Sequence, residues 1–250
     1  MNPDHPKGLS KNYIPLFIFA TTMGCLEAIV VVYVRELYYP DGFCFPLKIL
    51  PQWLIGIEIV REFSTLAMLG AVAWISGKIF LKRLSVFLFI FGIWDIMYYL
   101  ALKIFLNWPE SLLTWDILFM IPITWIGPVL APVICSALMI IMSLLFDYFQ
   151  NRENIKQLRA SEYFLLFGGA AIIYFTFTFD FGMILVKGNF LPHFFSMPNH
   201  PGFQEIMSTF TPTRFNWEIF TIGILLNCFG MILFVRRALK TKTDYDTTSN

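Results

Sequence analysis

Six apolar stretches, each long enough to cross a lipid bilayer, dominate this chain of 250 residues. A helix needs about 20 apolar residues to span the hydrocarbon core, where only helices and closed barrels satisfy their backbone polar groups. Charged residues make up 14% of the sequence, against about 25% in soluble domains. We therefore predict an all-α fold, a polytopic membrane helix bundle with about six transmembrane helices. The predicted spans cover about residues 14–37, 53–76, 84–105, 128–149, 161–186 and 217–236.

Two further segments are expected to lie against the bundle. The apolar stretch before the fourth span is too long for one crossing, and several prolines interrupt it. Pro109 suits the first turn of a short helix and Pro128 the start of another. We predict an interfacial or re-entrant helix near 110–121, then a bend at 122–127. Residues 187–216, rich in Phe and Pro, are expected to cap the bundle.

Basic residues in the loops indicate the orientation. When alternate loops are assigned to alternate sides, one side holds twelve Lys and Arg residues and the other holds four. The positive-inside rule then predicts that both termini are cytoplasmic, in a plasma (inner) membrane. We predict one membrane-embedded domain over residues 1–240 and a disordered cytoplasmic tail over the polar residues 241–250.

Charged residues lie inside the first three predicted spans, where they are costly. Each contributes an insertion cost of about 2.5–3.5 kcal/mol at the bilayer centre. Such groups are retained when they pair with one another, line a wet cavity or bind a ligand. These residues are Glu27, Arg35, Glu36, Glu58, Arg61, Glu62 and Asp95.

Helix geometry predicts that several of these groups meet. With a rise of about 1.5 Å per residue, Glu27, Arg61, Glu62 and Asp95 all lie about 12–15 Å below the outer ends of their helices. On the second span, Glu58 shares one helix face with Arg61 and Glu62, because the three follow i, i+3, i+4 spacing. We expect an ion pair between Glu27 and Arg61.

Two further arrangements follow from helical phase. Arg35, near the outer end of the first span, is expected to pair with Glu58. On the third span, Asp95, Tyr99 and Lys103 follow i, i+4, i+8 spacing and form a ladder that climbs toward the outside. Two interpretations of this ladder are equally supported. It is either a path for protons or substrate, or a lysine that extends to the membrane interface beside neighbours whose hydrogen bonds are already satisfied.

The charged residues therefore predict an acid-lined pocket that opens outward. Its deepest part holds three carboxylates and one guanidinium group, and an excess of buried negative charge requires either a protonated carboxyl or a bound cation. Asp116 and Asp180 add acid near the mouth. The candidate solute- or proton-binding residues are Glu27, Arg35, Glu58, Arg61, Glu62, Asp95, Tyr99 and Lys103. A purely structural ion-pair network is the alternative interpretation.

Other kinds of site find little support in the sequence. The net charge of +1 argues against a nucleic-acid partner. No histidine lies in a predicted span, and we favour ordinary loop histidines over a zinc site for His193 and His200. We predict no metal and no cofactor. We also find no nucleophile–base motif, so the sequence leaves open whether the protein is an enzyme.

Three functional classes remain, and all of them have the lipid bilayer as a partner. The favoured one is the binding or carriage of a small cationic or proton-coupled solute by exchangeable carboxylates. The second is an intramembrane enzyme that acts on a lipid-like amphiphile. The third is a non-catalytic subunit or anchor, in which the charged stripe docks a partner subunit or a second copy of the chain.

Overall fold

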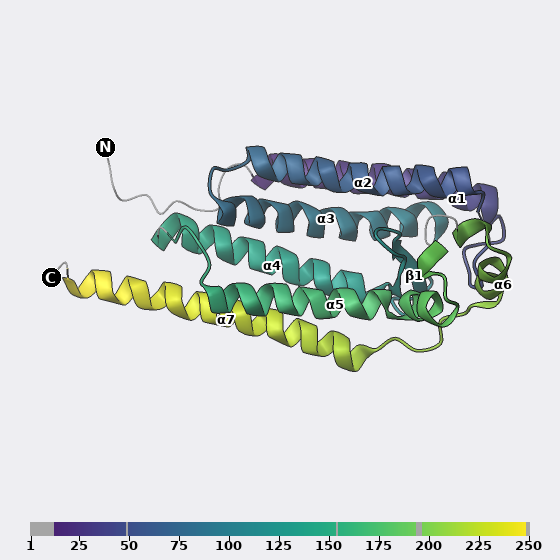
Figure 1. Cartoon of the computed structure of the whole chain (residues 1–250). Coiled ribbons are helices and arrows are strands. Elements are labelled where there is room, and N and C mark those ends of the chain that lie inside the picture. The colour runs from purple at the N-terminus through teal and green to yellow at the C-terminus, as the bar shows by residue number, and fades with distance from the viewer. Residues whose placement is uncertain (1–12, 49, 154, 194–196, 249–250) are drawn as a thin grey trace.

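We describe the protein from a computed structural model, which covers residues 13–48, 50–153, 155–193 and 197–248. Within these residues the chain forms long helices with one small hairpin between them (Figure 1). In chain order, the elements are α1 (Tyr13–Tyr38), α2 (Gln52–Ile75), α3 (Phe80–Leu106), β1 (Trp115–Phe119), β2 (Trp125–Pro128), α4 (Leu130–Glu153), α5 (Ala160–Lys187), α6 (Pro201–Thr209) and α7 (Trp217–Thr248). Short 3-10 turns occupy Leu191–His193 and Met197–Asn199.

The six long helices coincide with the six predicted spans. Five of them, α1, α3, α4, α5 and α7, are long and apolar enough to cross a membrane. The sixth, α2, has 24 residues and carries Glu58, Arg61 and Glu62 near its middle. Many large apolar side chains on these helices point outward, as Ile14, Phe63 and Phe164 do. The all-α prediction is confirmed, and the architecture is that of a helical membrane protein.

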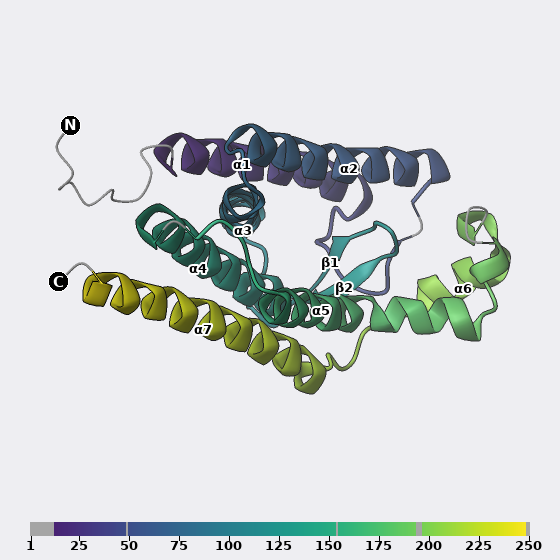
Figure 2. The same cartoon turned by 60° about the vertical axis from the view of Figure 1, so that its left-hand side comes forward.

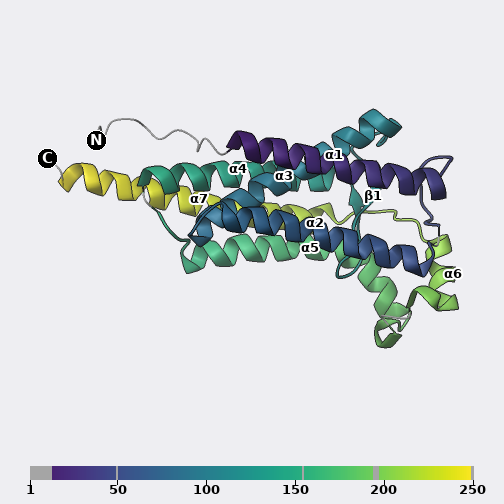
Figure 3. The same ribbon diagram turned by 90° about the horizontal axis from the view of Figure 1, so that it is seen from above.

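Helix α3 lies at the centre of the bundle. It packs against α1, α2 and α4, while α5 packs along α7 on the other side of α4 (Figures 1 and 3). Helix α1 begins and α7 ends at the same end of the bundle, which we call the terminal end (Figure 1). The opposite end, which carries β1, β2 and α6, is the hairpin end.

Small residues allow the helices to approach closely. A Cβ atom on Gly169 of α5 would lie 2.7 Å from the backbone oxygen of Gly223 in α7. A Cβ atom on Gly92 of α3 would lie 2.7 Å from the backbone oxygen of Ser136 in α4. Both distances are too short for real carbon–oxygen contacts, so glycine is required for the observed spacing. Close backbone approach of this kind is a common source of association between membrane helices.

The segment between α3 and α4 differs from the prediction. The expected interfacial or re-entrant helix near 110–121 is wrong, because this segment forms an antiparallel hairpin in which Asp116 pairs with Gly127 and Ile117 with Ile126. The strands are rich in aromatic and β-branched residues, which favour extended backbone, and Pro122 in the turn lacks the N–H that a helix needs.

The hairpin lies inside the bundle, between α1 and α2 on one side and α5 on the other (Figure 2). Non-helical backbone at membrane depth is tolerated where protein covers it. Ile126 and Phe119 are buried, and Ile126 packs with Phe181 and Leu185 of α5. The hairpin therefore supplies loop residues to the interior of the bundle.

The described residues of the segment 187–216 cap the hairpin end, as predicted. Met197 and Met207, the latter on α6, are buried in a cluster with Phe181 of α5 and Ile126 of β2. His200 precedes α6, and its Nδ1 atom accepts a hydrogen bond from the backbone N–H of Gly202 at 3.2 Å. The cap thus closes the hairpin end over α5 and the hairpin.

Two buried ion pairs join helices near the terminal end. Lys82 of α3 pairs with the fully buried carboxylate of Asp147 in α4. Arg237 of α7 donates two hydrogen bonds of 2.7 Å to the carboxylate of Glu162 in α5. Helix α7 continues to Thr248, so its backbone includes most of residues 241–250, for which we predicted a disordered tail; residues 249–250 lie outside the described residues.

Candidate intramembrane binding site

Arg61 of α2 is the centre of the deepest charged cluster. Its Nη1 atom pairs with the carboxylate of Glu27 in α1, which confirms the predicted pair. Its Nη2 and Nε atoms lie 2.8 and 2.9 Å from Glu58 Oε2, one turn earlier on α2. Thr65 Oγ1, a further turn along α2, donates to Glu27 Oε2 at 3.1 Å. Arg61 and Thr65 of α2 therefore face α1 and contact Glu27. Glu58 shares a helix face with Arg61, as the i, i+3 spacing predicted.

Glu62 joins α2 to the hairpin rather than to another charge. Both of its carboxylate oxygens accept the backbone N–H of Met120, at 3.0 and 2.8 Å. Met120 follows the last residue of β1 and begins the turn of the hairpin. Because Glu62 lies about 15 Å along α2 from its first residue, the turn reaches deep into the bundle. Glu62 therefore fixes the depth of the hairpin.

Arg35 pairs with the hairpin as well, so the predicted pair between Arg35 and Glu58 is wrong. Arg35 Nη2 lies 3.0 Å from Asp116 Oδ1 in β1, and Asp116 Oδ2 accepts the hydroxyl of Tyr99 at 3.2 Å. The guanidinium group is held over the ring of Trp108, 3.8 Å from its centroid. The arginine is drawn to Asp116 because the hairpin, absent from a purely helical interpretation, brings that carboxylate between α1 and α3.

Asp116 and Arg35 are both almost fully buried, at 1% and 7% exposure. Asp116 belongs to β1, outside the spanning helices. Burial raises the pKa of the Asp116 carboxyl, and the charge of Arg35 acts in the opposite direction. Among the described residues, Arg35 Nη1 finds no hydrogen-bond partner. A buried N–H group of this kind normally has water or a ligand as its acceptor.

Asp95 occupies a third environment. Its Oδ2 atom accepts the hydroxyl of Ser136 in α4 at 2.7 Å, which is the one side-chain hydrogen bond to this carboxylate from the described part of the chain. Asp95 is buried, at 9% exposure. It lies between α3 and α4 and has no guanidinium partner among the residues that the structure describes.

These groups line one cavity of about 130 Å³, which we call the charged cavity. A water molecule needs a cavity of about 10–15 Å³, so this one has room for several waters or a small solute. Seven of the eight predicted site residues line it, and Asp116 and Tyr98 join them. The seven are Glu27, Arg35, Glu58, Arg61, Glu62, Asp95 and Tyr99.

The charges in this cavity do not balance. Its lining includes five carboxyl groups and two guanidinium groups. Both arginines are paired with carboxylates, and Glu62 and Asp95 are held by neutral donors. Three acids thus exceed the available positive side chains. In a medium of low dielectric constant, such an excess requires protons or a bound cation.

Two predicted acidic or basic residues lie elsewhere. Lys103 Nζ donates to the backbone oxygens of Asn107 and Pro109, at 3.2 and 2.9 Å, so it caps the end of α3. The ladder of Asp95, Tyr99 and Lys103 therefore does not form one path, since its last member turns away. Asp180 of α5 does not line the charged cavity.

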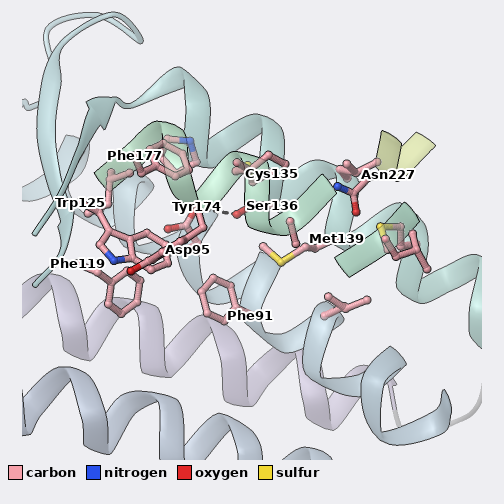
Figure 4. Close-up of a pocket in the computed structure, with 18 of the residues that line it drawn as sticks. Phe91, Asp95, Phe119, Trp125, Cys135, Ser136, Met139, Tyr174, Phe177 and Asn227 are labelled. Atoms are coloured by element: carbon pink, nitrogen blue, oxygen red, sulfur yellow. Dashed lines mark hydrogen bonds between the residues drawn. The ribbon is translucent and has the colours of Figure 1, made fainter. Parts of the chain in front are cut away.

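A second cavity, of about 300 Å³, adjoins the charged one. It lies between α3, α4, α5 and α7, with the hairpin at one end, and we call it the apolar cavity (Figure 4). Leucines, methionines and aromatic rings make up most of its lining. Asp95, Leu118 and Phe119 line both cavities. Asp95 thus stands at the boundary between them.

A third cavity, of about 160 Å³, lies toward the cap and includes Met197, Phe203 and Met207 in its lining. It shares Tyr39 and Met120 with the charged cavity, so the two adjoin at the hairpin end.

Some site residues could not be assigned from the sequence. Ser136 gave no signal, because hydroxyl residues are common in any span. Tyr98 stands beside Tyr99 on the third predicted span, and Trp108 follows that span as an expected interface anchor, but neither position indicated a contact with Arg35 or the cavity. Asp116 did carry a signal, as a lone acid in an apolar stretch, but its partner depended on the hairpin.

Metal ligands are not grouped in the described part of the chain, where no cluster of three or more His, Cys, Asp and Glu side chains could hold an ion. The side chain of His193 lies outside the described residues, so the interpretation of His193 and His200 as loop histidines stays a prediction. In comparisons with protein-family models, with curated proteins and with solved structures, nothing matched this chain.

Proposed function

We propose that this protein binds and carries a small cationic or proton-coupled solute in the charged cavity. The observation that carries the proposal is the excess of three carboxyl groups over guanidinium groups in that one cavity. A structural ion-pair network would pair each acid with a base, whereas Glu62 and Asp95 are held by neutral donors. These two carboxyls are therefore the ones that can exchange a proton or a cation without breaking an ion pair.

The adjoining third cavity supports an approach from the hairpin end. Arg35 and Asp116 stand closer to that end than the cluster around Arg61, because Arg35 is in the last turn of α1. With the basic loops at the terminal end, the positive-inside rule assigns the hairpin end to the outside. We accordingly propose a multi-pass protein of the plasma (inner) membrane with an outward-facing entrance and cytoplasmic termini.

Charge movement tests this function without knowledge of the natural solute. The purified full chain is reconstituted into proteoliposomes on a solid support, and currents are recorded on jumps of pH and of sodium, potassium, methylammonium and guanidinium. We expect a current for at least one jump. Glu62→Gln and Asp95→Asn should reduce it about tenfold or more, since each removes an exchangeable charge worth at least about 1.4 kcal/mol of binding.

Both variants are chosen to preserve the fold. A glutamine at position 62 still accepts the Met120 N–H, and an asparagine at position 95 still accepts the Ser136 hydroxyl. Asp180→Asn is the matched control, because it neutralises a carboxyl that belongs to a spanning helix and lines none of the three cavities. Wild-type currents equal to those of protein-free liposomes for every jump would overturn the proposal, as would currents that both cavity variants leave unchanged.

A further inference from the structure

The apolar cavity is not needed for a small inorganic cation. Its volume of about 300 Å³ exceeds that of the charged cavity, and it reaches the lower limit of the about 300–1,000 Å³ typical of small-molecule sites. Four helices surround it, and its lining offers few polar groups besides Asp95, Ser136 and Asn227. The side-chain N–H of Asn227 donates a hydrogen bond to the Gly223 backbone oxygen at 2.9 Å. A volume of this kind accommodates an apolar group better than water.

Aromatic rings form a continuous wall beside Asp95. Phe91, Phe119, Trp125 and Tyr174 follow one another with centroid separations of 6.4, 5.3 and 5.1 Å. All four line the apolar cavity together with Asp95 (Figure 4). An acid that shares a cavity with aromatic rings can bind an ammonium group, through charge attraction and cation–π contact.

We propose that the solute is a cationic amphiphile, an amine or quaternary ammonium with one apolar tail. Its charged end binds at Asp95, where the two cavities meet, and its tail occupies the apolar cavity. The inference rests on the proposed function, because it takes the cation-binding role of the acids as given and adds the chemical class of the ligand. An anionic head would meet the excess of acid, and a neutral head would leave that excess uncompensated.

Fluorescence quenching locates such a ligand. The full chain in lipid nanodiscs is titrated with dodecyltrimethylammonium carrying two bromines in its tail, and in parallel with the matching brominated dodecanol. Bromine quenches indole fluorescence at short range. Trp125 lines the apolar cavity, whereas Trp53 and Trp74 are exposed on the outer surface. Both compounds quench the exposed tryptophans equally from the bilayer, so the difference between them reports the cavity.

We expect a saturable excess of quenching by the ammonium compound. Its midpoint mole fraction should rise about tenfold or more in Asp95→Asn, and stay within about twofold of wild type in Asp180→Asn. Trp125→Phe should abolish the excess. Ala170→Phe, which adds a ring to the lining of the apolar cavity, should weaken binding of the long-chain compound while the small-cation currents described above persist.

The outcomes separate the inference from the proposed function. Equal quenching by the ammonium compound and the alcohol, together with small-cation currents that depend on Glu62, would overturn the assignment of an amphiphilic ligand. The proposed cation site would then still stand. An excess of quenching that Asp95→Asn leaves unchanged would also overturn it. If Asp95→Asn does not fold, Ala170→Phe decides, and undiminished long-chain binding in that variant refutes the assignment. Absence of both currents and excess quenching would remove the proposed function itself.

Discussion

The ion pair between Arg35 and Asp116 permits a sharp test of the structure, through the substitution Arg35→Met. The two side chains are 8% and 2% exposed, and Nη2 lies 3.0 Å from Oδ1. Methionine keeps an apolar side chain against Trp108 and Phe43 but removes the charge. Loss of one partner of a buried pair costs about 3–5 kcal/mol, because the other charge is left uncompensated. We expect a decrease of this size in the free energy of unfolding at pH 8.

The cost should depend on pH. Burial raises the pKa of Asp116 above its ordinary value, and Arg35 opposes that rise. A folded state with the higher carboxyl pKa binds the proton more tightly, so the free energy of unfolding falls as the pH rises from the ordinary pKa of about 3.9 to the raised one. Removal of Arg35 lifts the raised pKa further and extends this fall to higher pH. Arg35→Met should therefore cost less at pH 4 than at pH 8.

The assay is unfolding in mixed micelles, by titration with a denaturing detergent at both pH values and detection by circular dichroism. Arg214→Met provides the control, because its partner Glu218 lies four residues further along the chain and both side chains are largely exposed. Its effect should be hardly measurable. A loss below about 1 kcal/mol for Arg35→Met at pH 8, or the same loss at both pH values, would refute the reasoning.

Two further substitutions test the packing of the bundle in the same assay. Gly169→Leu should lower the free energy of unfolding by about 1–3 kcal/mol or more, since its Cβ would meet the backbone oxygen of Gly223, whereas Gly168→Leu faces open space and should be nearly neutral. Lys82→Met should cost about 3–5 kcal/mol, because it leaves the fully buried Asp147 carboxylate without its cation. Equal stabilities for the two glycine variants would contradict the close contact of α5 and α7. An unchanged free energy of unfolding in Lys82→Met would contradict the buried ion pair between Lys82 and Asp147.

The positions of charged residues along and around the helices could be predicted from the sequence, because helix geometry alone determines them. The depth of Glu27, Arg61 and Asp95 follows from the rise per residue, and the face that carries Glu58 and Arg61 follows from the angle between successive residues. These quantities are local, so they survive uncertainty of a few residues in the helix ends. The convergence of acids from three helices on one cavity was therefore predictable.

Two wrong predictions, the helix near 110–121 and the pair between Arg35 and Glu58, both result from the unexpected hairpin. Its path depends on contacts with α1, α2 and α5 that are distant in sequence, and short apolar runs do not distinguish strand from helix by periodicity. A helix over 110–121 does not bring Asp116 beside Arg35, whereas strand β1 does. Lys103 failed for a different reason, since a lysine in the last turn of a helix finds backbone oxygens within reach of its long side chain.

The charged stripe of α2 has a consequence for the way in which the protein enters the bilayer. Glu58, Arg61 and Glu62 would each oppose insertion of α2 as a solitary segment, by about 2.5–3.5 kcal/mol on insertion scales. Helix α1 precedes it and presents Glu27 to Arg61, so the partner is already in place when α2 emerges. We expect the two helices to integrate as a pair, and Glu27→Leu to lower the inserted fraction of α2 in a glycosylation-mapping assay. The ion pair between Glu27 and Arg61, which lines the charged cavity of the folded protein, would then also assist the insertion of α1 and α2 into the bilayer.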